Sequence, residues 1–238
     1  MASEITSPEK AYLTTTFTTL LQQFTTSPIT IQKWTTLLLT TYTEPHRHYH
    51  TTTHVTTMLQ HLEYSLPQIN NPTAVTLAII FHNWEYIPHS PPRFNEEQSI
   101  VHFEFFAAEL PLPSPLIQTV KKYILATISH KLDAEDGEDG DLRLFLDFDL
   151  EVLGRERGAY EIYREQIRKE YVNLRDEVYR EGRKCVLERL LARDRLFFSE
   201  RFYERFEKRA RENLMWEIGI LKGQGVESVD WVLMGSGF

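Results

Sequence analysis

The stretch from Glu44 to His54 concentrates side chains that can do chemistry, with four histidines and one arginine in eleven residues. Packing alone does not require this composition. Histidine changes its charge nearest to neutral pH, and its neutral ring is the commonest metal ligand. Apolar residues return at helical spacing from Val55 onward, so His50 and His54, four residues apart, are expected on one face of a helix. Such a pair can hold one metal ion, or one metal ion and a proton donor.

Two later stretches complete the pattern. His82 and Asn83 end an apolar run, and Asp147 and Asp149 lie in the segment 145–150. The arrangement resembles the HD superfamily of metal-dependent phosphohydrolases, whose pattern is a helical His, a later His-Asp pair and a distant Asp. Within it, the chain is most similar to predicted phosphohydrolases whose helix opens with Pro-His-Arg-x-Tyr-His-Thr-x-x-His. The similarity runs from about residue 34 to about residue 221. One departure is that the Asp of the His-Asp pair is Asn83.

The resemblance implies that His54, His82 and Asp149 are metal ligands on three separate helices, with Asn83 in the place of a fourth ligand. Divalent Mn, Co, Ni, Mg, Zn or Fe ions accept such sets of imidazole nitrogen and carboxylate oxygen. An amide offers one neutral oxygen and cannot bridge two ions, so we expect one divalent ion per chain. Asp147 is expected either to hold a ligating histidine or to be an acid at a helix N-terminus.

Several neighbours are candidates for contact with a substrate. In cyclic-nucleotide phosphodiesterases, which are distant relatives with a similar Tyr-His-x-x-x-His string, the earlier His protonates the leaving oxygen, and His50 inherits that role as a hypothesis. Arg47 can clamp a phosphate through its planar fork or pair with Glu44. The resemblance places Glu96 and His130 at the border of the pocket. Glu96 is then a substrate contact or an acid of a first helical turn, and His130 a phosphate contact or a second-metal ligand.

These expectations combine into a metal-dependent phosphohydrolase, either a phosphomonoesterase or a phosphodiesterase. It would act on a small phosphorylated metabolite such as a nucleotide, with metal-activated water attacking phosphorus. Asn83 raises an alternative from another class, a catalytically impaired HD-fold protein that binds a ligand or partner without turnover. Glu85, in the following loop, is the nearest carboxylate that could compensate for Asn83. A di-iron oxygenase is a third alternative, and Asn83 makes its additional ligands harder to assemble.

Composition limits the binding partners and the cellular location that are expected for this protein. The 238 residues carry a net charge of −8, which argues against general nucleic-acid binding. The single cysteine, Cys185, rules out an internal disulfide. No apolar run approaches the roughly 20 residues of a membrane span, and the first residues lack the pattern of a signal peptide. We therefore expect a cytoplasmic protein that does not bind membranes.

Hydrophobic periodicity, caps and breaks predict an all-α fold, with one HD-type helical domain at 1–222 and a C-terminal tail at 223–238. A hydroxyl cap at Ser7 and a proline after it start the first helix, and a second helix is expected from about Thr30. Arginines between 155 and 183 alternate with acids and predict exposed, ion-paired helix faces. Acids crowd the interruption at 131–141, which is expected to be a solvated loop. The later helices are expected at about 51–66, 72–83, 95–110, 114–129, 141–153, 157–181, 183–193 and 203–222, with a proline-rich loop at 84–94.

Overall fold

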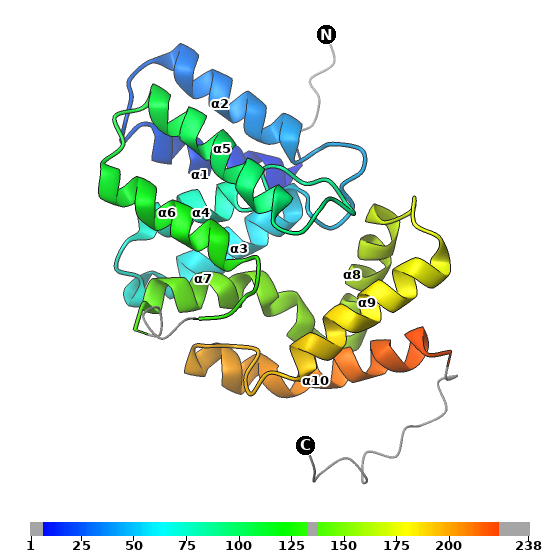
Figure 1. The fold of residues 1–238 in the computed structure, drawn as a ribbon. Helices are drawn as coiled ribbons and strands as arrows, with labels where there is room; N and C mark the ends of the chain where they lie inside the picture. Colours follow the sequence, from blue (N-terminus) through cyan, green and yellow to red (C-terminus); the bar gives the residue numbers. More distant parts are fainter. Residues whose placement is uncertain (1–6, 133–137, 224–238) are drawn as a thin grey trace.

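A computed structural model describes residues 7–132 and 138–223, and in these ranges it contains helices and no strand (Figure 1). The all-α prediction is confirmed. Residues 133–137 of the expected acidic loop at 131–141, and all but the first residue of the expected tail at 223–238, lie outside these ranges. The helices are α1 (Pro8–Leu21), α2 (Pro28–Thr41), α3 (Thr52–Ser65), α4 (Pro72–Phe81), α5 (Phe94–Glu109), α6 (Ser114–Ala126), α7 (Gly140–Leu150), α8 (Arg157–Glu170), α9 (Asp176–Leu191) and α10 (Glu200–Leu221), with short 3₁₀ turns η1 (Leu66–Gln68) and η2 (Glu151–Gly154).

Side-chain caps followed by proline begin three of the helices. The Ser7 hydroxyl accepts a hydrogen bond from the Lys10 N–H, as predicted, and proline occupies the first turn. Ser27 caps α2 in the same way, so this helix begins at Pro28, slightly earlier than expected. Asn71 caps α4. Each cap satisfies an N–H that has no partner within its helix.

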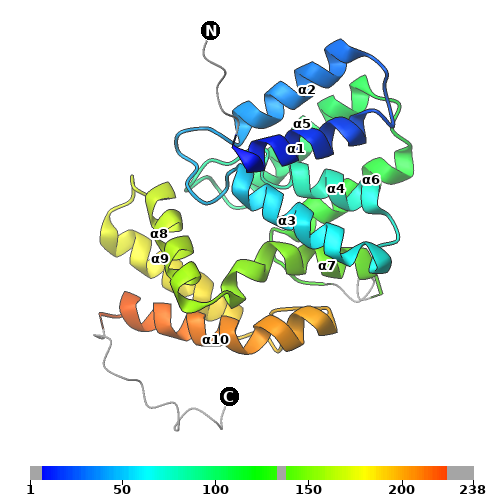
Figure 2. The ribbon, with the colours of Figure 1, turned by 180° about the vertical axis from the view of Figure 1, so that it is seen from behind.

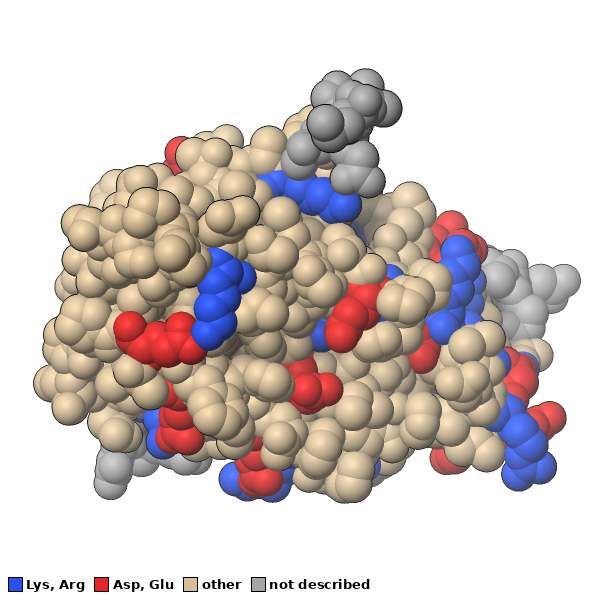
Figure 3. All heavy atoms as spheres, turned by 90° about the horizontal axis from the view of Figure 1, so that it is seen from above, with Lys and Arg blue, Asp and Glu red and all other residues tan. Residues whose placement is uncertain are grey.

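The threonine-rich N-terminal sequence is helical because its apolar residues keep helical spacing. Phe17 and Leu21 of α1 and Trp34 and Leu38 of α2 are buried, while most threonines face outward. α2 carries only one charged residue, Lys33. Charged side chains on the face seen from above are scattered and do not gather into one patch (Figure 3).

Helix α4 forms the centre of the N-terminal part of the molecule. Every residue from Ala74 to Phe81 is buried, and α3, α5, α6 and α7 pack around this helix (Figure 1). A helix that is apolar all round belongs inside a core. Its last turn therefore delivers the residue that follows, His82, to a buried position.

The chain leaves its helix after Glu170, which corrects the predicted helices at 157–181 and 183–193. α8 ends there, α9 begins at Asp176, and Gly182, expected between two helices, lies within α9. The turn contains no glycine or proline. Arg168 holds it instead, because its guanidinium donates to the carbonyls of Tyr171 and Leu174.

Helices α8 and α9 form a hairpin beside the loops that join α2 to α3 and α4 to α5 (Figures 1 and 2). α10 packs against α9 and η2. One expected surface residue of this region is largely covered: the Arg183 side chain, 10% exposed, donates to both carboxylate oxygens of Glu217, whose side chain is fully inaccessible. Within the described ranges, no helix has both the length and the apolar character needed to cross a membrane.

Candidate metal centre

Three predicted ligands from distant parts of the sequence meet in space. His54 lies on α3, His82 directly follows α4, and Asp149 lies on α7. The two Nε2 atoms are 3.3 Å apart, and Asp149 Oδ1 lies 3.2 Å from His54 Nε2 and 3.7 Å from His82 Nε2. These atoms form a compact group that could hold a metal ion.

The size of this triangle fits one cation. A metal about 2.1 Å from each ligand atom separates neighbouring ligand atoms by about 3.0 Å in octahedral and about 3.4 Å in tetrahedral coordination. The observed separations, 3.2 to 3.7 Å, match or slightly exceed these values. Small shifts of the side chains would therefore complete the site.

Both histidines direct Nε2 toward the place a metal ion would occupy. His82 Nδ1 lies 2.9 Å from the Ile79 carbonyl oxygen, so this nitrogen carries the proton and Nε2 keeps its lone pair. Burial lowers the pKa of His54 to about 4, although the hydrogen bond to Asp149 opposes the shift. His54 is therefore neutral at physiological pH, and a neutral imidazole is the form that binds metals.

Asp149 supplies the negative charge. Burial would raise its pKa, but the neighbouring imidazoles of His130, His54 and His82 outweigh burial and hold the pKa well below its usual range. His130 Nε2 lies 2.7 Å from Oδ2, the oxygen that faces away from the histidine pair. The structure thus places His130 on the ligand carboxylate, where it would orient Asp149.

Asn83 touches the site, but through its nitrogen. In this structure Nδ2 lies 2.7 Å from His82 Nε2, so the amide donates to the lone pair that a metal would use. Turning the amide over would present its carbonyl oxygen instead. Glu85 does not compensate, because its carboxylate lies 3.2 Å from His102 Nε2 and is not among the three grouped ligands.

His50 lies beside the metal-ligand group, although not on the helix as predicted. It precedes the cap residue Thr51, because α3 begins only at Thr52. Its ring is 5.7 Å from the ring of His54, between centroids, and its side chain is 17% exposed. Nδ1 lies 2.8 Å from Glu170 Oε2, which fixes the ring.

Glu170 is the most extensively bonded residue near the site, and sequence reasoning missed it. Its Oε1 accepts the backbone N–H groups of His48, Tyr49 and His50 at 2.8, 2.7 and 2.9 Å. Its Oε2 also accepts the Tyr86 hydroxyl at 2.8 Å. Burial would raise the pKa of Glu170, but the charge and hydrogen bond of His50 and these backbone donors keep it well below the usual range. Three consecutive N–H groups form a concave anion site, and the chain fills it with its own carboxylate.

Arg47 is buried, and its guanidinium forms hydrogen bonds within the protein. Its Nε donates to Glu44 at 2.8 Å, which is the alternative that the sequence left open. The fork donates to the carbonyls of Asn83 and Trp84, each at 2.8 Å. These bonds leave no outward donor pair for a phosphate clamp, and they hold the chain that follows His82.

The two remaining acids lie apart from the ligands. Asp147 accepts the N–H groups of Phe198 and Ser199, the two residues before α10, so it fixes the start of the chain that enters this helix and holds no ligating histidine. Burial raises its pKa to about 6 despite these bonds. Glu96 is half-buried in the first turn of α5, in line with the simpler of its two predicted roles.

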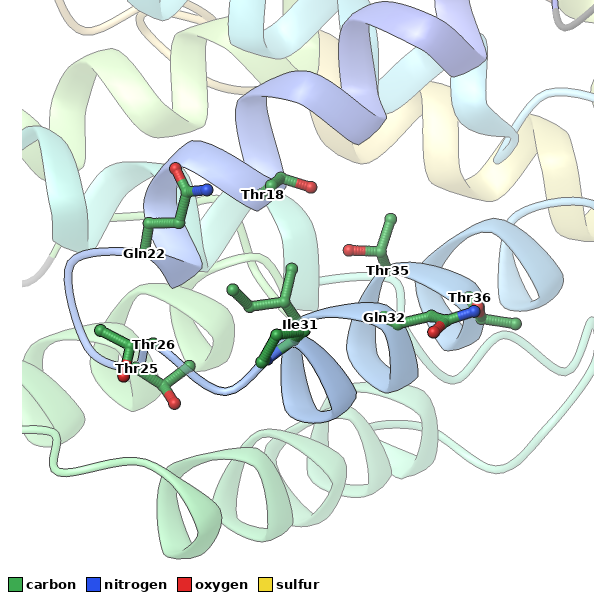
Figure 4. Close-up of a pocket in the computed structure, with 9 residues that line it drawn as sticks. Thr18, Gln22, Thr25, Thr26, Ile31, Gln32, Thr35 and Thr36 are labelled. Atoms are coloured by element: carbon green, nitrogen blue, oxygen red, sulfur yellow. The ribbon is translucent and has the colours of Figure 1, made fainter.

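The site reaches solvent along a narrow edge. The side chains of Asp149, His50 and His130 are 14, 17 and 20% exposed. A cavity of about 560 Å³ lies elsewhere, between α1 and α2, and is lined mostly by threonine and glutamine (Figure 4). None of the candidate site residues lines it. The candidate metal centre is therefore exposed to solvent only in part, at the side chains of Asp149, His50 and His130.

Comparisons with known protein families, with curated proteins and with solved structures find no significant match to this chain.

Proposed function

We propose that the protein is a metal-dependent phosphohydrolase that acts on a small phosphorylated metabolite, with nucleotides as the first class to test. The observation that carries the proposal is the triangle of His54 Nε2, His82 Nε2 and Asp149 Oδ1, which has the size of one divalent coordination sphere. A histidine next to the triangle, His50, supports hydrolysis over mere metal storage.

A bound divalent ion would supply the Lewis-acid chemistry of hydrolysis, by lowering the pKa of a water molecule and neutralising phosphoryl charge. His54, His82 and Asp149 would hold it with a net ligand charge of −1. This charge balances one dication only in part, and the remaining positive charge favours an anionic substrate. His130 keeps Asp149 turned toward the two histidines.

His50 is suited to handle the leaving-group proton. Glu170 accepts from Nδ1, so Nε2 is the nitrogen left to exchange a proton with a substrate oxygen. The five hydrogen bonds that Glu170 receives fix its carboxylate, and a fixed carboxylate orients the ring. Catalysis by proton transfer depends on such orientation.

The Asn83 amide favours a second candidate function, ligand binding without turnover. Its nitrogen occupies the His82 lone pair in this structure, and an aspartate in its place would attract a cation instead. If the amide keeps this orientation in solution, metal binding must first displace it.

Metal content by mass spectrometry and titration with Mn²⁺ would separate the two candidates. We expect about one transition-metal ion per chain in protein purified without chelator. His54→Ala should weaken Mn²⁺ binding by at least about 100-fold, since even partners behind the ligands are worth 10- to 100-fold. His102→Ala is the matched control, because His102 pairs with Glu85 away from the site.

Turnover of a panel of nucleotides and other phosphoesters would complete the test. Metal binding with metal-dependent hydrolysis that His50→Ala abolishes would support the phosphohydrolase. No metal in the native chain, with binding gained in Asn83→Asp, would overturn it in favour of the binding protein.

A further inference from the structure

The segment 192–199, between α9 and α10, forms hydrogen bonds with two elements that flank the candidate metal centre, the turn at 129–130 and helix α7. The Arg193 guanidinium donates to the carbonyls of Ser129 and His130, at 2.7 and 2.9 Å. The N–H groups of Phe198 and Ser199 donate to Asp147, two residues before the ligand Asp149. One segment thus ties the ligand-bearing helix α7 to the turn that carries His130.

That turn has an unusual backbone. α6 ends at Ala126, and His130 adopts a left-handed conformation with φ of 46°. A residue with a side chain rarely occupies this region, and it persists only where the surroundings hold it. The carbonyls at the end of α6 also lack helical partners, and Arg193 supplies donors to two carbonyls of this turn.

The backbone of the segment that carries Arg193 is itself held in place by hydrogen bonds. Arg211 donates to the Arg193 carbonyl at 2.7 Å, and Glu207 accepts the N–H groups of Leu196 and Phe197, whose side chains are fully buried. Because this backbone is fixed, the Arg193 side chain can hold the turn at His130 in one position, which a mobile surface side chain could not do.

We infer that Arg193 is a positioning residue of the metal centre, acting through His130. By holding the left-handed turn, it directs the His130 ring Nε2–H to Asp149 Oδ2 and leaves Oδ1 to face His54 and His82. The inference rests on the proposed function in so far as it concerns metal affinity. It deepens that function, because the oxygen that could bridge to a second ion already accepts a hydrogen bond, so the centre holds one ion.

Arg193→Met removes the donors while keeping an unbranched chain, and Arg180→Met is its matched control. Arg180 also donates to two carbonyls, those of Ile220 and Leu221, but far from the site. Two readouts are needed: the ¹⁵N NMR signals of the His130 ring in metal-free protein, and the Mn²⁺ dissociation constant. We expect Arg193→Met to shift the ring signals and weaken Mn²⁺ binding about tenfold, and Arg180→Met to change neither.

A double variant tests whether Arg193 acts through His130. His130→Ala should weaken Mn²⁺ binding about 10- to 100-fold, and adding Arg193→Met should weaken it no further. Unchanged ring signals and unchanged affinity in Arg193→Met would overturn the inference, as would fully additive losses in the double variant.

The test still decides the role of Arg193 if the Arg193→Met variant does not fold or if the wild-type protein binds no Mn²⁺. If Arg193→Met does not fold, Arg193→Lys decides, because lysine keeps the charge without the two-pronged donor; intermediate affinity supports the inference and wild-type affinity overturns it. If the wild-type protein binds no Mn²⁺, the proposed function fails, while the His130 ring signals in the metal-free variants still decide the role of Arg193.

Discussion

Replacing Glu170 by glutamine changes one atom at a carboxylate that receives five hydrogen bonds. The amide oxygen can still accept the three N–H groups of residues 48–50, as a neutral acceptor. The amide nitrogen, however, would face the two donors that now meet Oε2, from His50 and Tyr86. His50 would have to move its proton from Nδ1 to Nε2 to avoid a clash of donors.

The expected loss of stability follows from these five bonds. A hydrogen bond to a charged group is worth about 1 kcal/mol more than a neutral one, so five bonds lose about 5 kcal/mol. Removing the charge also removes its desolvation cost, which is several kcal/mol for a buried ion. The net expectation for Glu170→Gln is a loss of about 2 kcal/mol in the free energy of unfolding at pH 7.

The difference in unfolding free energy between wild type and Glu170→Gln also depends on pH. The folded-state pKa of Glu170 is depressed, so its stabilisation is complete above the unfolded-state pKa, near 4.3, and is lost as the pH falls toward the folded-state pKa. Each pH unit below about 4.3 removes about 1.4 kcal/mol. Urea unfolding of both proteins at pH 7 and pH 3 should therefore show a gap of about 2 kcal/mol that nearly closes at the lower pH.

Glu165→Gln controls for the loss of a charge on the same helix, since Glu165 is exposed, and it should differ little from wild type at either pH. A Glu170→Gln gap that stays constant between pH 7 and pH 3 would refute the argument. So would a variant as stable as the wild type that keeps the wild-type ¹⁵N signals of His50.

Three further changes test other features. Gly154→Ala should destabilise the protein by about 3 kcal/mol, because the added Cβ would lie 2.5 Å from Phe206 Cβ, and a thermal midpoint equal to wild type would contradict this. Gly182→Ala, inside α9 with open space around it, should instead stabilise the protein by about 1 kcal/mol, and a fall in the midpoint would count against the helix as described. Arg47→Met should lower the free energy of unfolding by about 2 kcal/mol, measured with urea, since two carbonyls lose their donors. An Arg47→Met variant that is as stable as wild type but binds phosphate more weakly would instead place Arg47 in the substrate site.

Local chemistry made much of the fold predictable. The cap at Ser7 and the apolar spacing of the later helices are local signals, and the structure follows them. The end of α8 was not predictable in this way, because the turn after Glu170 has no breaking residue and depends on contacts of Arg168. Gly182 was misread for the converse reason, since helix packing tolerates a glycine whose surroundings are open.

In the candidate site, too, local sequence signals identified some residues and missed others. Residue type and resemblance were enough to select His54, His82 and Asp149, which the structure brings together. Glu170 could not be selected, since one acid among arginines at helical spacing looks like part of a solvated face. Its backbone partners at 48–50 lie 120 to 122 residues away, and no local pattern encodes such a separation.

That separation also orders events while the chain is being made. The N–H groups at 48–50 leave the ribosome 120 residues or more before the carboxylate that binds them. At about 5–20 residues per second, they wait roughly 6 to 24 s for Glu170. The last of the three candidate metal ligands, Asp149, is made 21 residues before Glu170, so for roughly the final 1 to 4 s of this interval the nascent chain carries all three while the anion site beside them stays open to any small anion in solution.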